Sequence, residues 1–251
     1  MTFSEDELAR YARHIVLREI GGAGQSRLRA SRVAVIGAGG LGAPALLYLA
    51  AAGVGRIDII DDDRVSVSNL QRQVIFDTAA VDRPKAEAAA ARLRGINPHV
   101  DVRPVLLRLD PGNAGEILDG ADLVLDGSDS FATRQAVNAA CVAAGIPLIG
   151  AAMTQWEGQI SLYHPKIGTP CYACLFPEAP AAGLAPSCAE AGIIGALPGV
   201  MGSMMAVEAI KLVARAGRSL AGRMLIYDAL DADWRSFRVT PRDDCTICNG
   251  R

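Results

Sequence analysis

The sequence predicts an α/β fold, with a Rossmann-like, mostly parallel sheet that has helices on both faces and is extended by antiparallel strands. Short apolar segments alternate with helical segments over residues 33–149, which is typical of parallel strands joined by crossover helices. The first apolar segment runs into a glycine-rich loop that opens a helix. After about residue 150 this alternation stops, and residues 159–163 alternate as an antiparallel strand does.

Five short apolar runs are the predicted parallel strands, because each is bounded by polar or turn-forming residues. They are residues 33–36, 56–60, 100–106, 123–125 and 147–149. The predicted helices are residues 4–20, 43–52, 84–94, 114–118 and 131–144. The first of them begins with a capping box formed by Ser4 and Glu7, and Gly145 closes the last.

The second half of the chain is less regular. Residues 165–198 are rich in Pro, Gly and Ala and show little periodicity, which predicts a long loop. An apolar helix follows at residues 200–214, and it belongs either to the core or to an interface between subunits. A last antiparallel pair is predicted at residues 224–228 and 234–239. Because no repeat or linker interrupts the chain, we expect a single domain over residues 1–251.

Composition narrows the class of protein. The formal net charge is -2 over 251 residues, whereas nucleic-acid-binding domains are usually basic. The amphipathic N-terminus lacks the apolar region of a signal peptide, and the apolar stretch at residues 41–54 is too short to span a membrane. We therefore expect a cytoplasmic protein that acts on neither nucleic acid nor membranes.

Residues 37–42 match the pattern G-x-G-x-x-G through Gly37, Gly39 and Gly42. Between a strand and a helix, such glycines let the backbone approach a phosphate at the positive end of the helix dipole. Asp61 ends the next strand, where a carboxylate can accept hydrogen bonds from ribose hydroxyls. Taken alone, the motif favours an NAD- or FAD-dependent Rossmann oxidoreductase, and a tight turn without any ligand is the structural alternative.

The basic residues beyond this motif favour a more highly charged nucleotide. Arg72 lies in the polar run 68–73, and Lys85 stands at a helix start, where a cation opposes the helix dipole. Together they could neutralise a triphosphate, although each alone is more simply interpreted as a solvated surface residue. Asp129 follows a strand end, where a carboxylate can support Mg²⁺. The alternative is that Asp129 or Ser130 caps the following helix.

Two C-x-x-C pairs, 70 residues apart, predict a metal centre. Four thiolates suit a closed, tetrahedral structural Zn²⁺ site, and two redox pairs or a disulfide are the alternatives. The four residues are Cys171, Cys174, Cys245 and Cys248. Cys141, on a predicted helix, is interpreted as a small core residue.

In these motifs, taken in order, the chain resembles the MoeB/ThiF/HesA family, relatives of the ubiquitin-activating enzymes, and it is most similar to the MoeB-like subgroup. The resemblance covers nearly the whole chain. It rests on segments 10–14, 37–42, 61, 69–73, 84–85, 125–129, 157–159, 170–174, 188–192 and 245–248.

The resemblance implies a role for each matched residue. The glycine loop would hold ATP with Gly40 near the phosphates, Asp61 would bind the ribose, and Asp129 would support Mg²⁺ and the reacting centre. Three residues would contact the phosphates, namely Asn69, Arg72 and Lys85. Arg13 matches an arginine that reaches from one subunit of a homodimer into the site of its partner.

The implied activity is ATP-dependent adenylylation of the C-terminal glycine carboxylate of a small ubiquitin-like sulfur carrier ending in Gly-Gly. The carrier would be MoaD- or ThiS-like and would serve molybdopterin or thiamine synthesis. Residues 1–150 would bind the nucleotide, whereas residues 151–251 would bind the carrier and hold the zinc. Sulfur would come from a separate donor protein, because no rhodanese-like segment follows in the sequence.

Some alternatives stay open at this stage. Cys188 aligns with a cysteine that holds the carrier covalently in some relatives, while MoeB-like members can do without it. A non-catalytic scaffold for the carrier is a further possibility, against which the matched Arg13, Arg72, Lys85 and Asp129 argue. An oxidoreductase would leave these cations and both C-x-x-C pairs without a role.

Overall fold

A single eight-stranded sheet forms the centre of the molecule in the computed structural model, which describes residues 2–179 and 191–250. Its strand order is β3-β2-β1-β4-β5-β6-β7-β8, parallel from β3 to β5 and antiparallel from β5 to β8. The strands are β1 Arg32–Ile36, β2 Arg56–Ile60, β3 Asp101–Val105, β4 Leu123–Asp126, β5 Leu148–Thr154, β6 Glu157–Tyr163, β7 Arg223–Asp228 and β8 Asp233–Arg238. The predicted α/β class is confirmed.

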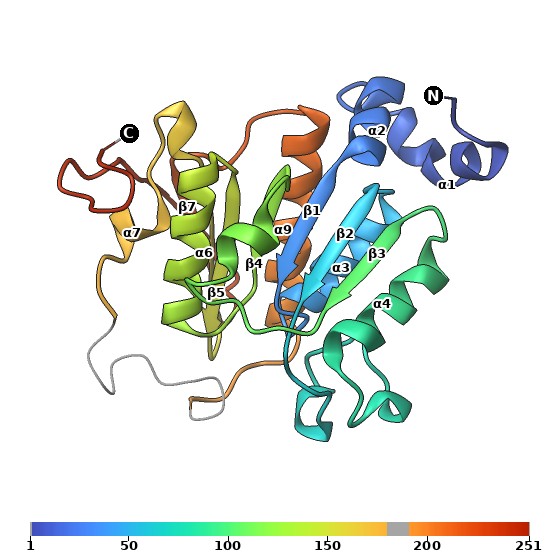
Figure 1. Cartoon of the computed structure of the whole chain (residues 1–251), viewed down its shortest axis with the longest axis horizontal. Coiled ribbons are helices and arrows are strands. Elements are labelled where there is room, and N and C mark those ends of the chain that lie inside the picture. The colour runs from blue at the N-terminus through green and yellow to red at the C-terminus, as the bar shows by residue number, and fades with distance from the viewer. Residues whose placement is uncertain (1, 180–190, 251) are drawn as a thin grey trace.

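Helices cover both faces of this sheet (Figure 1). The larger core lies on the face covered by α3, α4 and α9, and a second core lies under α5 and α6. The helices are α1 Glu5–Ile15, α2 Gly21–Ala30, α3 Gly42–Ala51, α4 Lys85–Ile96, α5 Ala114–Leu118, α6 Phe131–Ala144, α7 Tyr172–Leu175 and α9 Leu197–Ala214. Short 3-10 turns lie at Val67–Asn69, Thr78–Ala80 and Pro165–Ile167.

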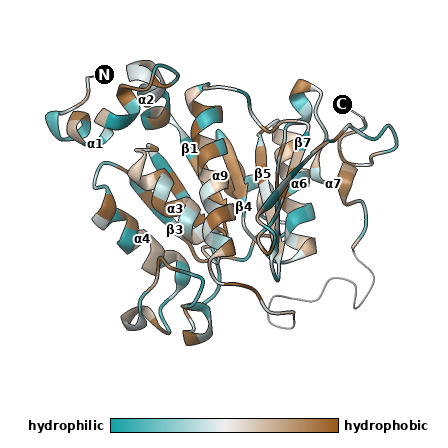
Figure 2. Cartoon of the chain, turned by 180° about the vertical axis from the view of Figure 1, so that it is seen from behind, coloured by the Kyte–Doolittle hydropathy of each residue, from teal (hydrophilic) through white to brown (hydrophobic). Residues whose placement is uncertain are grey.

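The central strands are apolar on both faces because helices pack against each of them. In β1, Val33 and Val35 are fully buried in the larger core, while Ala34 and Ile36 are buried in the second. Figure 2 shows mostly apolar colouring at the centre of the sheet, around β4 and β5. All residues of β8 are exposed, since it forms the edge of the sheet.

The N-terminal helices correct the sequence interpretation. The helix predicted at residues 4–20 ends at Ile15, and a second helix, α2, follows it. Three glycines made α2 a poor candidate, because glycine weakens an isolated helix. Tertiary contacts stabilise α2 instead: Leu28 is fully buried, and the buried Gln25 donates a hydrogen bond from Nε2 to the Ala52 carbonyl at 2.7 Å.

Helix α9 is long and apolar enough to cross a membrane by length and composition alone. Half of its residues are buried within the molecule, where it packs on α3 and on strands β5 and β6. Met201 and Met205 are fully buried in the larger core. These contacts identify α9 as a core helix that closes one face of the sheet.

Candidate active site and metal centre

The glycine loop lies between the carboxyl end of β1 and α3. Gly37 adopts φ 85°, and its N–H donates to the Ile60 carbonyl at 2.8 Å, which ties the loop to β2. A Cβ on Gly42 would lie 1.8 Å from the Gly37 carbonyl oxygen. The turn from strand into helix therefore closes only with glycine at position 42, which leaves backbone N–H groups at the start of α3 facing the carboxyl edge of the sheet.

Asp61 braces this loop from the end of β2. Its carboxylate accepts hydrogen bonds from the N–H groups of Ala38 and Asp63, at 2.7 Å and 2.9 Å. Burial raises the pKa of Asp61, although the Ala38 N–H and the charge of Lys85 oppose this. Asp61 therefore orders the glycine loop through these two hydrogen bonds.

Lys85 starts α4, and its side chain is only 7% exposed. Its Nζ lies 2.8 Å from the carboxylate of Asp63, which is largely exposed. The Lys85 ammonium is therefore held beside two carboxylates, those of Asp61 and Asp63, at the mouth of the glycine loop. Asp63 as its partner was not predicted.

The polar run also reaches this edge. Asn69 ends a 3-10 turn, and Arg72 donates from Nη1 to the Ser68 carbonyl at 3.0 Å, so that its guanidinium folds over its own turn. Gln73, which we had not singled out, is 5% exposed and its Oε1 has no partner among the described residues. A Cβ added to Gly39 would lie 3.6 Å from the Gln73 Nε2, so the Gln73 amide faces the glycine loop.

Asp129 lies on the loop after β4 and is exposed. The neighbouring Ser130 caps α6 by accepting a hydrogen bond from the Thr133 N–H at 3.4 Å. The cap and the exposed carboxylate thus fall on adjacent residues, which leaves Asp129 free of the capping role. This loop meets the glycine loop, because a Cβ on Gly37 would lie 3.2 Å from the Gly127 carbonyl.

Arg13 is the predicted site residue that the fold does not bring to this edge. It lies on α1, whose Tyr11 hydroxyl accepts a hydrogen bond from Asn97, just before β3, at 2.9 Å. Figure 1 shows α1 beside the starts of β1 to β3, whereas the glycine loop follows the opposite, carboxyl end of β1. Arg13 is exposed and has no ion pair or hydrogen bond among residues 2–179 and 191–250.

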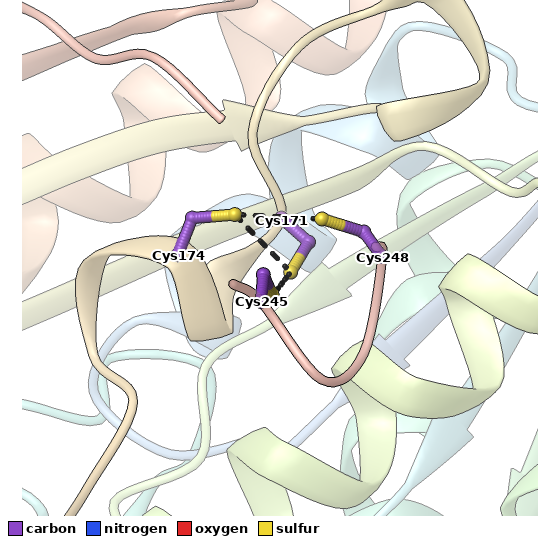
Figure 3. Close-up of side chains that lie close together, drawn as sticks. All are labelled: Cys171, Cys174, Cys245 and Cys248. Carbon is purple, nitrogen blue, oxygen red and sulfur yellow. Dashed lines mark hydrogen bonds between the residues drawn. The ribbon is translucent and has the colours of Figure 1, made fainter. Parts of the chain in front are cut away.

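The four predicted metal ligands come together as one buried cluster (Figure 3). The Sγ–Sγ distances are 3.8 Å for Cys171 to Cys174, 3.6 Å for Cys171 to Cys245, and 3.4 Å for Cys174 to Cys248. Four sulfurs around a zinc ion with Zn–S bonds of about 2.3 Å are about 3.8 Å apart, so the donor set fits tetrahedral zinc. All four thiols are free of disulfides.

The thiols of this cluster differ in acidity. Burial raises the pKa values of Cys171 and Cys174. Burial also acts on Cys245, but the N–H groups of Cys248 and Ile247 outweigh it and lower the pKa of Cys245 to about 7. The two N–H groups and the neighbouring thiols of Cys248 and Cys171 thus favour the thiolate form of Cys245. Of the other cysteines, Cys141 is buried in the second core, and Cys188 lies outside the described residues.

The fold and these sites define an α/β nucleotide-binding protein with an appended four-cysteine centre. The ThiF family matches residues 11–247, and the chain belongs to this family. The SAMP-activating enzyme E1 of Haloferax volcanii is 50% identical, over 99% of this chain and 92% of that protein. The sulfur carrier protein adenylyltransferase of Thermus thermophilus is 48% identical, over 99% of this chain and 93% of that protein.

Solved structures agree on the fold. The crystal structure of E. coli MccB superposes with a TM-score of 0.84 at 24% sequence identity. The superposed region covers 100% of this chain and 74% of the MccB chain. This likeness confirms the architecture of the sheet and its helices.

Proposed function

We propose that this chain is an ATP-dependent adenylyltransferase that activates the C-terminal glycine carboxylate of a small ubiquitin-like sulfur carrier. The observation that carries the proposal is the meeting of the glycine loop, Lys85 and Asp129 at one edge of the sheet, in a chain that is 48% identical to a sulfur carrier protein adenylyltransferase along nearly its whole length. The carrier carboxylate attacks the α-phosphorus of ATP, pyrophosphate leaves, and an acyl adenylate forms.

The task of the protein in this reaction is charge neutralisation and alignment, because the carboxylate and the triphosphate are both negative. No general base is needed, since a terminal carboxylate is ionised at neutral pH. In this proposal the glycine loop and the start of α3 offer N–H groups to the phosphates, and Asp61 binds the ribose. The proposed phosphate ligands are Asn69, Arg72 and Lys85, and binding of ATP would draw Lys85 away from Asp63.

An oxidoreductase that binds NAD or FAD was the alternative from the glycine motif alone. It gives no role to Lys85 beside the loop or to the four-cysteine cluster, and the relatives reported above are activating enzymes or adenylyltransferases. We therefore do not retain it.

Asp129 is the proposed support for Mg²⁺, which favours carboxylate and phosphate oxygens. Asp129→Asn should lower carrier-dependent ATP–pyrophosphate exchange by about a hundredfold, because charge stabilisation at the reacting centre is lost. Binding of the carrier, measured by calorimetry, should persist. Asp119→Asn, at the end of α5 on the opposite edge of the sheet, is the control, and equal losses in both variants would contradict the proposed role.

Zinc is the metal that the cluster fits. Its role would be to hold Cys245 and Cys248 against Cys171 and Cys174 at the start of α7. Elemental analysis should find about one zinc ion per chain, as a closed four-thiolate site predicts. Cys248→Ser should lose zinc and unfold at a lower temperature, whereas Cys141→Ser should keep the metal. A stably folded preparation without zinc would contradict this assignment.

A homodimer explains how Arg13 could act although it lies at the far edge of its own chain. The chain has an open apolar groove of about 720 Å³ between α3 and α9, lined by Leu47, Tyr48, Val74, Ile96 and Val200. Tyr48 is 57% exposed and Val74 is 62% exposed, and together with the other lining residues they form a contiguous apolar surface of the kind that marks interfaces. We assign a second copy of this chain as the occupant of the groove.

The two halves divide the work in this proposal. Residues 1–150 bind ATP, and residues 151–251 hold the zinc and bind the carrier, whose MoaD-like or ThiS-like identity decides between molybdopterin and thiamine synthesis. A separate protein supplies the sulfur. The reaction takes place in the cytoplasm.

A further inference from the structure

Helix α6 carries two polar side chains one turn apart, Arg134 and Asn138, and each contacts a different functional region. Residues at i and i+4 lie on the same face of a helix. Arg134 contacts the loop that carries Asp129, and Asn138 contacts the cysteine cluster. The proposed catalytic edge and the proposed metal centre are thus bonded to one rigid helix.

Asn138 is only 1% exposed. Its Oδ1 accepts a hydrogen bond from the Tyr172 N–H, between Cys171 and Cys174, at 2.9 Å. Its Nδ2 is buried and makes no hydrogen bond within the described residues. A buried amide N–H without a partner is costly, and native structures rarely contain one without a reason.

Since the same side chain is bonded to the N–H of Tyr172, the residue after Cys171, the partner that we assign to Nδ2 is the Cys171 sulfur. A metal-bound thiolate carries the negative charge that the unpaired amide hydrogen requires. Such outer-shell donors orient metal ligands and contribute to metal affinity.

Arg134 lies in the first turn of α6, which contains no acidic residue, so that its charge opposes the helix dipole. Its Nη2 donates to the Ser128 carbonyl at 2.6 Å, while the buried Asp126 accepts from the Ser128 N–H at 2.9 Å. Both backbone polar groups of Ser128 are therefore held, and Asp129 is the next residue. Arg134 and Tyr172 also line the same small cavity.

We propose that Asn138 is an outer-shell residue of the four-cysteine zinc centre, and that zinc binding at this centre orders the Asp129 loop through α6 and Arg134. The contacts run from the Tyr172 N–H to Asn138, along one turn of α6 to Arg134, and from Arg134 to the Ser128 carbonyl. The part that concerns the Asp129 loop rests on the proposed function, whereas the part that concerns zinc does not.

The first test measures zinc release to a colorimetric chelator from the intact protein. Asn138→Asp keeps the acceptor for Tyr172 but removes the buried Nδ2 donor, and it should release zinc about ten- to a hundredfold faster. Gln135→Leu is the matched control, because Gln135 on the same helix donates to the Phe176 carbonyl at 2.8 Å without bonding the cysteine segment 171–174. Equal release rates for Asn138→Asp and the unaltered protein would overturn the outer-shell role.

The second test is hydrogen–deuterium exchange, which does not depend on any reaction. Removal of zinc should speed exchange at residues 127–131 in the unaltered protein, and Arg134→Gln should raise exchange there while zinc stays bound. Unchanged exchange at 127–131 after zinc removal would overturn the link through α6. If no pyrophosphate exchange is found with any carrier, the proposed function fails alone, and these two readouts still decide the inference.

Discussion

Arg13→Ala is expected to lower carrier-dependent ATP–pyrophosphate exchange about a thousandfold, the effect of losing an arginine that stabilises charge on a reacting phosphate. Folding should be unaffected, because Arg13 is exposed and has no partner in the described part of its own chain. Melting temperature and zinc content check this point. Arg18→Ala, on the exposed turn after α1, is the control and should retain activity.

Mixing variants distinguishes action across the dimer from action within one chain. When Arg13→Ala subunits exchange with Lys85→Ala subunits, each mixed dimer has one site with an intact Lys85 and the intact Arg13 of the partner. An equal mixture with random pairing should recover about one quarter of normal activity, because half of the dimers are mixed and each has one working site. Recovery of no activity from a mixture in which native mass spectrometry detects the mixed dimer would contradict the role of Arg13 across the dimer.

Gly42→Ala should destabilise the protein by about 3 kcal/mol or more and abolish nucleotide binding, since overpacking against fixed backbone is costly. The added methyl group would lie 1.8 Å from the Gly37 carbonyl oxygen, where both partners belong to the same tight turn. Thermal unfolding and ATP titration are the measurements.

The matched control is Gly39→Ala in the same loop. Its Cβ would meet only the Gln73 amide, at 3.6 Å, which is ordinary contact. Its stability should change by no more than about 1 kcal/mol. If both variants lost the same stability, the geometry of the turn would not be the reason for glycine at position 42.

Sequence patterns were sufficient for the parts of the fold that rest on periodicity. Strands β1, β2 and β4 and helices α5 and α6 lie where apolar runs and caps place them, because burial on both faces of the sheet leaves a strong local signal. Helix α2 could not be predicted, since contacts with distant residues such as Ala52 stabilise it against its own glycines.

The candidate site shows the same division. The spacing of the four cysteines predicts a cluster, and Asp61 and Asp129 follow strands whose carboxyl ends meet at one edge. The partners of Lys85 and Asn138 are set by tertiary packing, and a single sequence holds no local signal for them. The sequence does hold one signal for Arg134. A cation in the first turn of a helix opposes the helix dipole, so its presence there indicates a contact outside the helix.

ATP–pyrophosphate exchange with Mg²⁺, measured with a series of candidate carriers ending in Gly-Gly, tests the central claim most directly. The account predicts exchange that requires both the carrier and its last glycine, and the carrier with the highest rate would identify the pathway. Absence of exchange with every carrier, in a dimeric preparation that contains zinc and binds ATP, would contradict the assignment as an adenylyltransferase.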